Sequence, residues 1–504
     1  MNNNVEVNES INSFGKIRSI LWPIHRSELK KFLLLSFLMF ANIFVYTVVS
    51  NLKDVFVLSC ATLGGAELLS PLKSVLVLPS TILIATIFSF IAVKFGMRKT
   101  FYYSISFFAL FLFLFAFVLL PNASNLHLSA ETMINLQNSV PGFMYYIIPI
   151  IGNWSFSLFY ILAETWGVVS INSLFWNVAN RVTSKDEAVR FYAMFHAIGC
   201  FGRLLAGKFT KVISKTGNTF IYNAQIIIGF ACLFCIISMI IYYFTNKTKS
   251  DVENNSLEDK NLQDKRNTKK VKVRFFEGIK ILFSSKYLFL IFIIPLSYGV
   301  GMHLFEVIFK GYIRSLSSNP NEVAHTIGQL SQLTGFLTFV LTFTGTYILR
   351  NYKWKHAALI TPITLCISGG LFFILVFLQK IEVLNSFSHL GTLWIGMLID
   401  AVIKGMKYCM LDPTKSMTYR VLNEDTQARA QGAIEIVGGR GGKGLGAAVV
   451  MLFTSIFYPG SKIIEHTFGL FLSFIVVVLL WIISCNKLGD LYEEKNKNKT
   501  KEGG

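Results

Sequence analysis

The amino-acid sequence predicts an all-α membrane protein that crosses the lipid bilayer many times. Hydrophobic residues make up 53% of its 504 residues, and charged residues make up only 15%. Long apolar stretches without a charge recur along the chain, and one long polar stretch lies near its middle. Together these observations exclude a large soluble protein, because soluble domains need more charge, about 25% of their residues, to cover their surface.

The apolar stretches are long enough to cross a bilayer, which takes about 20 residues of α-helix. Examples are "FLLLSFLMFANIFVYTVVS" and "SISFFALFLFLFAFVLL". From length and apolar content we predict about twelve spans. They are expected near residues 32–51, 70–93, 101–120, 143–174, 190–212, 219–244, 284–309, 325–349, 356–379, 390–411, 430–457 and 464–485.

Lysine and arginine gather in the loops after even-numbered spans and at both chain ends. Such loops contain "KFGMRK", "RVTSKDEAVR" and "RNYKWK", whereas "PNASNLHLSAETMINLQNSVPG", after an odd-numbered span, has no lysine or arginine. Because basic loops stay in the cytoplasm, we predict that the segments 1–31 and 486–504 are cytoplasmic. The net charge of +19 is therefore attributed to membrane topology and not to nucleic-acid binding.

The polar stretch at 245–283 has the composition of a solvated cytoplasmic linker. It divides the predicted spans into an N-terminal six-helix half at 32–244 and a C-terminal six-helix half at 284–485. This plan is typical of major-facilitator-like carriers, which bind their solute between the halves near the middle of the membrane. We find no convincing sequence repeat between the halves.

Several charged side chains interrupt the apolar runs. Each costs roughly 2.5–3.5 kcal/mol on insertion scales, so each needs a reason. Glu164 and Glu306 lie away from the ends of their runs and read as unpaired acids, which favours a functional role over a structural one. Lys53 and Lys73 lie near span ends, where the alternative is an ammonium group that extends to the membrane surface.

Further basic residues lie in the tenth and eleventh spans. Lys404 and Lys407 interrupt the tenth, and for Lys407 the membrane surface is again the alternative. Arg440 and Lys443 lie in the glycine-rich "GGRGGKGLG". Glycines in spans allow close helix packing, which explains the glycines but not the lysine. Lysines and glutamates along one pathway suit an anionic or zwitterionic solute, with the lysines holding the anion.

The glycine-rich segment matches a phosphate-binding P-loop, G-x-x-x-x-G-K-[ST], only in part. With Lys443 aligned on the P-loop lysine, Val437 replaces the first glycine, and Gly444 replaces the serine or threonine. The apolar "AAVVMLF" follows where a P-loop has soluble α/β sequence. We therefore predict that Lys443 is a charged contact within a membrane helix.

An enzyme acting on nucleotides is the alternative from another class. It would need a catalytic constellation or metal ligands, but His196, His303 and His356 do not have ligand spacing. "LDPTK" resembles an aspartyl-phosphate signature, whose usual form also needs a large soluble nucleotide domain. A channel usually lacks this mixture of buried opposite charges. We therefore expect no enzymatic activity, no metal and no cofactor.

Long motifs resemble one known family in the expected order. They include "NLKDVFVLSC", "AETWGVVSINSLFWNVANRVTSKDEAVRFYAMF", "LSYGVGMHLFEVIFKGYI" and "LDPTKSMTYRVLNEDTQARAQGAIEIVGGRGGKGLGAA". The family is that of the ATP/ADP translocases, or nucleotide transporters, of obligate intracellular bacteria and plastids. The resemblance covers roughly residues 20–485. It implies that Lys53, Glu164, Glu306 and Lys443 match the four charged positions regarded as central in the family.

The resemblance also implies a function, which is import of ATP in exchange for ADP across a bacterial inner membrane by alternating access. Nucleotides and the lipid bilayer are the expected partners, and we expect a monomer. Two departures leave the nucleobase and the phosphate number open: "GKGLG" lacks a hydroxyl beside its lysine, and the seventh span reads "LFEV". A proton-coupled importer or exchanger of other nucleotides or phosphorylated solutes is the alternative, with Glu164 or Glu306 as its proton site.

Overall fold

The computed structural model describes residues 22, 24–250, 282–283, 285–317, 319–384, 388–423, 426–427, 430–431 and 434–502. Every regular element in these residues is helical. Most of the segment 1–31 and of the linker 245–283 lies outside the described residues. Two helices extend further than expected. The helix α12 (Phe220–Ser250) enters the predicted linker, and α21 (Thr467–Glu502) continues into the predicted tail.

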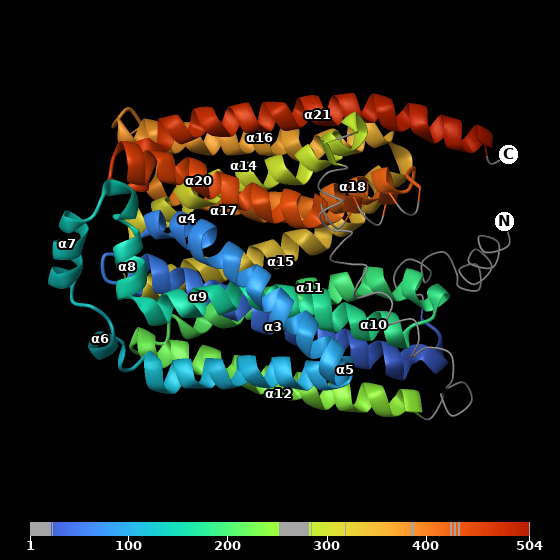
Figure 1. Ribbon diagram of the computed structural model, residues 1–504, viewed down its shortest axis with the longest axis horizontal. Helices are drawn as coiled ribbons and strands as arrows, with labels where there is room; N and C mark the ends of the chain where they lie inside the picture. Colours follow the sequence, from blue (N-terminus) through green and yellow to red (C-terminus); the bar gives the residue numbers. More distant parts are fainter. Residues whose placement is uncertain are drawn as a thin grey trace.

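Most of the long helices run along the longest axis of the molecule, side by side (Figure 1). Three short helices lie at one end of this bundle, α6 (Ala123–Leu126), α7 (Ala130–Ser139) and α8 (Ile147–Gly152). We call this end the loop end. The first turns of α3 and the last turns of α21 lie at the opposite end, which we call the terminal end (Figure 1).

The helices form two groups along the chain. The first group, residues 24–250, contains α3 (Leu29–Val55), η2 (Phe56–Cys60), η3 (Ala66–Leu68), α4 (Leu69–Pro71), η4 (Leu72–Val77), α5 (Leu78–Leu114), η5 (Phe115–Leu119), the loop-end helices, η6 (Gly142–Met144), α9 (Trp154–Trp166), η7 (Gly167–Phe175), α10 (Trp176–Val182), α11 (Lys185–Ile213) and α12. The second group, residues 282–502, contains α14 (Lys286–Leu316), α15 (Pro320–Asn351), α16 (Trp354–Lys380), α17 (His389–Met406), η8 (Lys407–Leu411), α18 (Asp412–Tyr419), η9 (Ile434–Arg440), α20 (Gly441–Met451), η10 (Leu452–Phe457), η11 (Ile463–His466) and α21.

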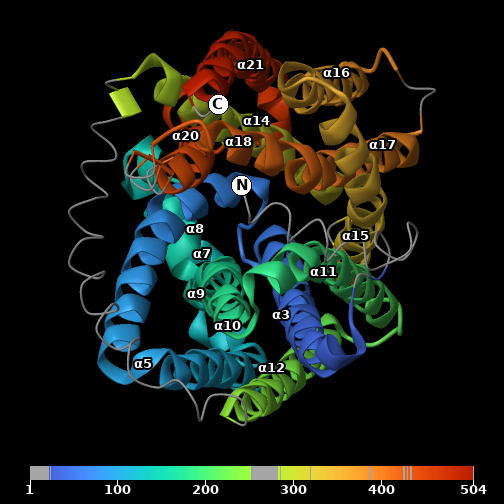
Figure 2. The same cartoon turned by 90° about the vertical axis from the view of Figure 1, so that its right-hand side faces the viewer.

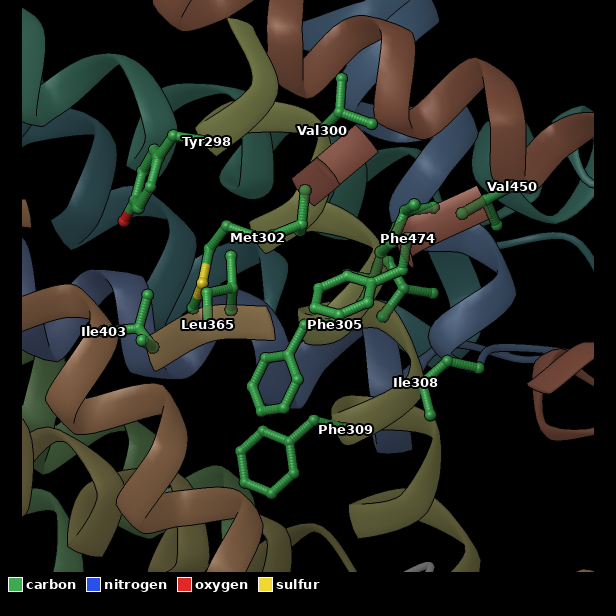
Figure 3. Packing of buried hydrophobic residues seen from close by; sticks show 14 of the residues in the cluster. Tyr298, Val300, Met302, Phe305, Ile308, Phe309, Leu365, Ile403, Val450 and Phe474 are labelled. Carbon is green, nitrogen blue, oxygen red and sulfur yellow. The ribbon is translucent and has the colours of Figure 1, made fainter. Parts of the chain in front are cut away.

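Each group is built around its own apolar core. The first core lies wholly within the first group and includes Phe56, Phe159 and Trp166. The second core is centred on α14, where Phe305 and Phe309 pack against other buried apolar side chains of the second group (Figure 3). This second core also takes in residues from the end of α3 and from α4, so the two groups share packing near the loop end.

The two groups meet along α11 and α15, which lie side by side between them (Figure 2). Glycine makes this approach possible, because a Cβ on Gly207 would collide with the backbone at Gln332, and a Cβ on Gly328 would lie 2.6 Å from the backbone nitrogen of Lys211. Small residues at helix contacts are the usual means of close packing within membranes.

Eight segments in the described part of the chain are long and apolar enough to cross a membrane. One of them, Ala66–Leu119, contains both the second and the third predicted spans, which a break at Gly96 (φ 76°) separates. The described residues of the fifth, tenth and eleventh predicted spans are largely helical, but none of these three spans is among the eight segments, and charged residues interrupt each of them. The protein is therefore an all-α polytopic membrane protein, and the number twelve stays a prediction.

The fourth predicted span, 143–174, is wrong in its boundaries. Asn153 (φ −101°, ψ 46°) breaks the helix between α8 and α9, and its amide donates to the backbone oxygens of Pro149 and Thr62 at 2.7 and 2.8 Å. The spanning segment instead runs from Trp154 to Val182. Hydropathy alone did not detect this break, because apolar residues flank Asn153 on both sides.

Candidate functional site

An ion pair joins α3 to α9 inside the first group. Lys53 Nζ lies 3.0 Å from Glu164 Oε1. The same ammonium lies 4.4 Å from the centre of the Tyr160 ring, one turn before Glu164 on α9. Because Lys53 is only 3% exposed, its ammonium does not extend to the membrane surface, and that alternative is wrong.

Asp54 extends this pair into the second group. Its Oδ1 accepts a hydrogen bond from Lys53 Nζ at 2.9 Å, and its Oδ2 lies 2.8 Å from Lys310 Nζ on α14. Asp54 and Lys310 are 7% and 8% exposed. Each oxygen of this buried carboxylate therefore faces one lysine, which offsets the desolvation cost of all three charges.

Glu306 on α14 holds a second pair of lysines. Its Oε1 lies 2.8 Å from Lys404 Nζ on α17, and its Oε2 lies 3.4 Å from Lys73 Nζ on η4. Lys73 is buried, so it too does not extend to the membrane surface. Since Lys73 belongs to the first group and Glu306 to the second, this cluster also crosses between the groups.

Asp400 lies beside this second cluster. Its Oδ2 is 2.9 Å from Lys404 Nζ, one helical turn further along α17. The other carboxylate oxygen, Oδ1, has no hydrogen-bond donor among the described residues. At 1% exposure, Asp400 is a deeply buried acid that depends on a single lysine for its counter-charge.

His303 on α14 lies between Lys73 and the side chain of Ser70 on α4. Its Nδ1 lies 3.4 Å from Lys73 Nζ, and its Nε2 lies 3.1 Å from Ser70 Oγ. The imidazole is 1% exposed. A ring held at both nitrogens restricts where the Lys73 ammonium can lie, so His303 positions this lysine.

The glycines around Lys443 pack α20 against α14. A Cβ on Gly442 would collide with the backbone of Leu296, and a Cβ on Gly446 would lie 3.0 Å from the Cβ of His303. A Cβ on Gly439 would meet nothing within 4 Å. The sequence predicts a packing role for all the glycines. In the structure, the glycines that face α14, such as Gly442 and Gly446, have this role, and Gly439 does not.

Lys443 itself is exposed, in contrast to the lysines described above. It forms no ion pair with any other described side chain, although its charge acts on Glu164, Lys73 and Glu306. Arg440, half-buried at the end of η9, also acts on Glu164. Lys443 thus faces the charged cluster with an ammonium that is available to an anion.

Lys407 does not join this cluster. Its Nζ lies 2.8 Å from Asp412 Oδ2, and Lys415 Nζ lies 3.3 Å from Asp412 Oδ1. The Lys407 ammonium also lies 4.4 Å from the centre of the Tyr408 ring. Among the predicted site residues, Lys407 is thus the one that the structure places in a separate set of ion pairs.

The sequence interpretation of Glu164 and Glu306 as unpaired acids is wrong, because lysines from other helices meet both of them. Three charged participants were missed, Asp54, Lys310 and Asp400. A signal existed for each: Asp54 directly follows Lys53, Lys310 lies one turn after Glu306, and Asp400 interrupts the apolar "IGMLIDAVI".

The cluster combines more lysines than carboxylates within and between the two groups. Its members are Lys53, Lys73, Lys310, Lys404, Lys443, Asp54, Glu164, Glu306 and Asp400. Several lie beside π-helical segments, a widening of the helix that is frequent at functional sites. The five lysines exceed the four carboxylates by one positive charge, which favours an anion over a cation.

The helices are arranged in a major-facilitator-like fold. The chain is similar to a bacterial homologue of the iron transporter ferroportin in an inward-facing state (TM-score 0.56, 11% identity, 92% of this chain and 100% of that chain covered). It is also similar to a D-xylose–proton symporter (TM-score 0.55, 13% identity, 91% and 97% covered). At these identities the similarity concerns the fold alone.

The sequence comparison is more specific. The profile of the TLC ATP/ADP transporter family matches residues 7–492, so this chain belongs to that family of membrane transporters and is not an enzyme. Its relatives include ADP,ATP carrier protein 1 of Rickettsia prowazekii, 34% identical over 98% of this chain and 100% of the relative. ADP,ATP carrier protein 4 of Rickettsia conorii is 32% identical over 98% of each chain.

Proposed function

We propose that this protein imports ATP across the bacterial inner membrane in exchange for ADP, by alternating access. The observation that carries the proposal is the buried cluster of lysines and carboxylates that joins the two helix groups, because it offers positive charge to a polyphosphate where the groups meet. The names of the relatives, ADP,ATP carrier proteins, support the choice of solute.

In this proposal, the predicted halves at 32–244 and 284–485 move against each other as units in a monomer, with both chain ends in the cytoplasm. Lys443 and Lys53 bind substrate phosphate. Glu164 and Glu306 hold the lysines in place while the site is empty. The ionic contacts of Glu164 and Glu306 support this role, since each binds at least one lysine of the cluster.

Flux measurements on the purified protein in lipid vesicles test the proposal. Uptake of radiolabelled ATP is compared between vesicles loaded with ADP and vesicles loaded with buffer alone. Exchange predicts rapid uptake only with internal ADP. Equal uptake in both kinds of vesicle would contradict exchange, and a lack of competition by unlabelled ATP and ADP would contradict the choice of solute.

Asp400 favours a second candidate function, the proton-coupled import of nucleotides. A deeply buried acid whose ion pair is with Lys404 alone among the described residues can exchange that contact for a proton. This candidate predicts that an inward proton gradient drives ATP uptake into vesicles without internal nucleotide. If the gradient leaves uptake unchanged, the second candidate fails.

A further inference from the structure

Asp54 and Lys310 tie the two helix groups together through buried charges. Asp54 lies near the loop end of α3, and Lys310 lies on α14, 2.8 Å away. Asp54 also holds Lys53, so the three residues form a continuous bridge, Lys53–Asp54–Lys310. All three are less than one-tenth exposed, and water therefore cannot readily replace a partner that leaves.

Other contacts between the groups lie toward the same end of the molecule. Tyr146, just before α8, donates a hydrogen bond to the backbone oxygen of Ser461 at 2.7 Å. The backbone N–H of Ile463 donates to Glu67 Oε1 at 2.8 Å. These hydrogen bonds are partly exposed, whereas the bridge is buried, so the bridge is the costlier contact to break when the loop end opens.

A polyphosphate competes directly with Asp54. It presents several anionic oxygens, and Lys53 and Lys310 are the lysines that Asp54 occupies. When phosphate oxygens bind these lysines, the ionic contact between the two helix groups is replaced by a contact with the substrate, which later dissociates. In the empty protein no such replacement is available, and opening the loop end would separate buried charges.

We propose that Asp54 and Lys310 are coupling residues that prevent the empty carrier from changing sides. The inference rests on the proposed exchange function and explains why exchange is obligatory: only a bound anion releases the Lys53–Asp54–Lys310 bridge. Asp54 is thus a positioning residue, which acts through the lysines and does not need to touch the nucleotide.

Two variants break the bridge in vesicles. Asp54→Asn removes the carboxylate that both lysines share. Lys310→Gln removes the ion pair between the two helix groups but leaves the ion pair between Lys53 and Asp54. The readout is the ratio of ATP uptake with internal ADP to uptake without it. In both variants uptake into vesicles without internal nucleotide is expected to rise, so that this ratio falls by about tenfold or more, as the loss of a buried ion pair allows.

Asp412→Asn is the matched control, because Asp412 also holds two lysines, but both lie in its own helix group. The control is expected to keep the wild-type ratio. Bridge variants that insert normally and keep the wild-type uptake ratio overturn the inference, and so do bridge variants that lose all transport. The inference also fails if the uptake ratio falls as much in Asp412→Asn as in the bridge variants. Wild-type protein that needs no internal nucleotide overturns the proposed exchange function instead, whatever the variants do.

Discussion

Glu306 Oε1 lies 2.8 Å from Lys404 Nζ in the second helix group, and this pair repeats the Lys53–Glu164 pair of the first group with the charges exchanged. In the predicted order of spans, one pair joins the seventh to the tenth and the other joins the first to the fourth. In the predicted plan of two six-helix halves, these positions are equivalent. A structural repeat is therefore visible in the ion pairs, although the sequence shows no convincing repeat.

Neutralising Glu164 should stop or re-couple transport without preventing membrane insertion. Glu164→Gln leaves the buried Lys53 with Asp54 alone, and that lysine is then free to hold phosphate too long or in the wrong place. Uptake of ATP and its pH dependence are measured in vesicles. Glu187→Gln, which breaks the ion pair between the first turns of α11 and α3 at Lys31, is the control. Normal uptake with unchanged pH dependence and affinity would show that Glu164 is only structural.

The lysine of the second pair should matter for stability through Asp400. Lys404→Gln leaves Asp400 buried without its cation, which should lower the free energy of unfolding by about 3–5 kcal/mol. Asp400→Asn in the same chain should restore the part of this loss that comes from the uncompensated Asp400 charge, while Glu306 keeps only Lys73. Thermal unfolding in detergent compares the two single variants with the double variant. Additive losses would mean that the two residues do not act as a pair.

The glycines beside Lys443 should differ in their tolerance of alanine. Gly442→Ala should impair folding or transport, because its new Cβ would collide with the backbone of Leu296. Gly439→Ala is the matched control in the same segment, since its Cβ would meet nothing within 4 Å. Expression level and size-exclusion profile report on folding. Equal tolerance at both positions would show that α14 and α20 do not pack as closely as described.

Sequence reasoning could find single charges in the membrane but not their partners. The cost of a charge in an apolar run identified Glu164 and Glu306 without any contact information. The lysines that meet them come from other helices, so their pairing depends on tertiary packing. Lys310 was missed because it lies one residue beyond the predicted seventh span, 284–309. The break at Asn153 is likewise specified by hydrogen bonds that hydropathy does not record.

The predicted topology can be tested with reporters. The basic loops place both chain ends and the linker in the cytoplasm, and the segment after the third span on the other side. Reporter fusions after residue 260 and after residue 130 should therefore report opposite sides of the membrane. A fusion at the C-terminus should agree with the fusion after residue 260. If the two internal fusions report the same side, the number of spans between them is even and the predicted topology fails.

Lys443 should bind substrate phosphate as a point charge, without a P-loop and without an obligatory magnesium ion. It is exposed and has no ion pair among the described side chains, whereas the other lysines of the cluster are held by carboxylates. Lysine supplies charge without the planar fork of arginine. Lys443→Arg should therefore keep only part of the function that Lys443→Ala loses.

The number of phosphates decides between the two mechanisms. In a pathway of reduced dielectric, the attraction of Lys443 grows with the charge of the ligand, so Lys443→Ala should weaken triphosphate binding on the order of tenfold and monophosphate binding less. Competition of mono-, di- and triphosphates against labelled ATP measures this, with magnesium present and with magnesium chelated. An equal loss for all three nucleotides, or a collapse of wild-type binding without magnesium, would contradict the point charge and favour a P-loop-like site. A graded loss that is independent of magnesium would instead support Lys443 as a single positive charge that binds substrate phosphate.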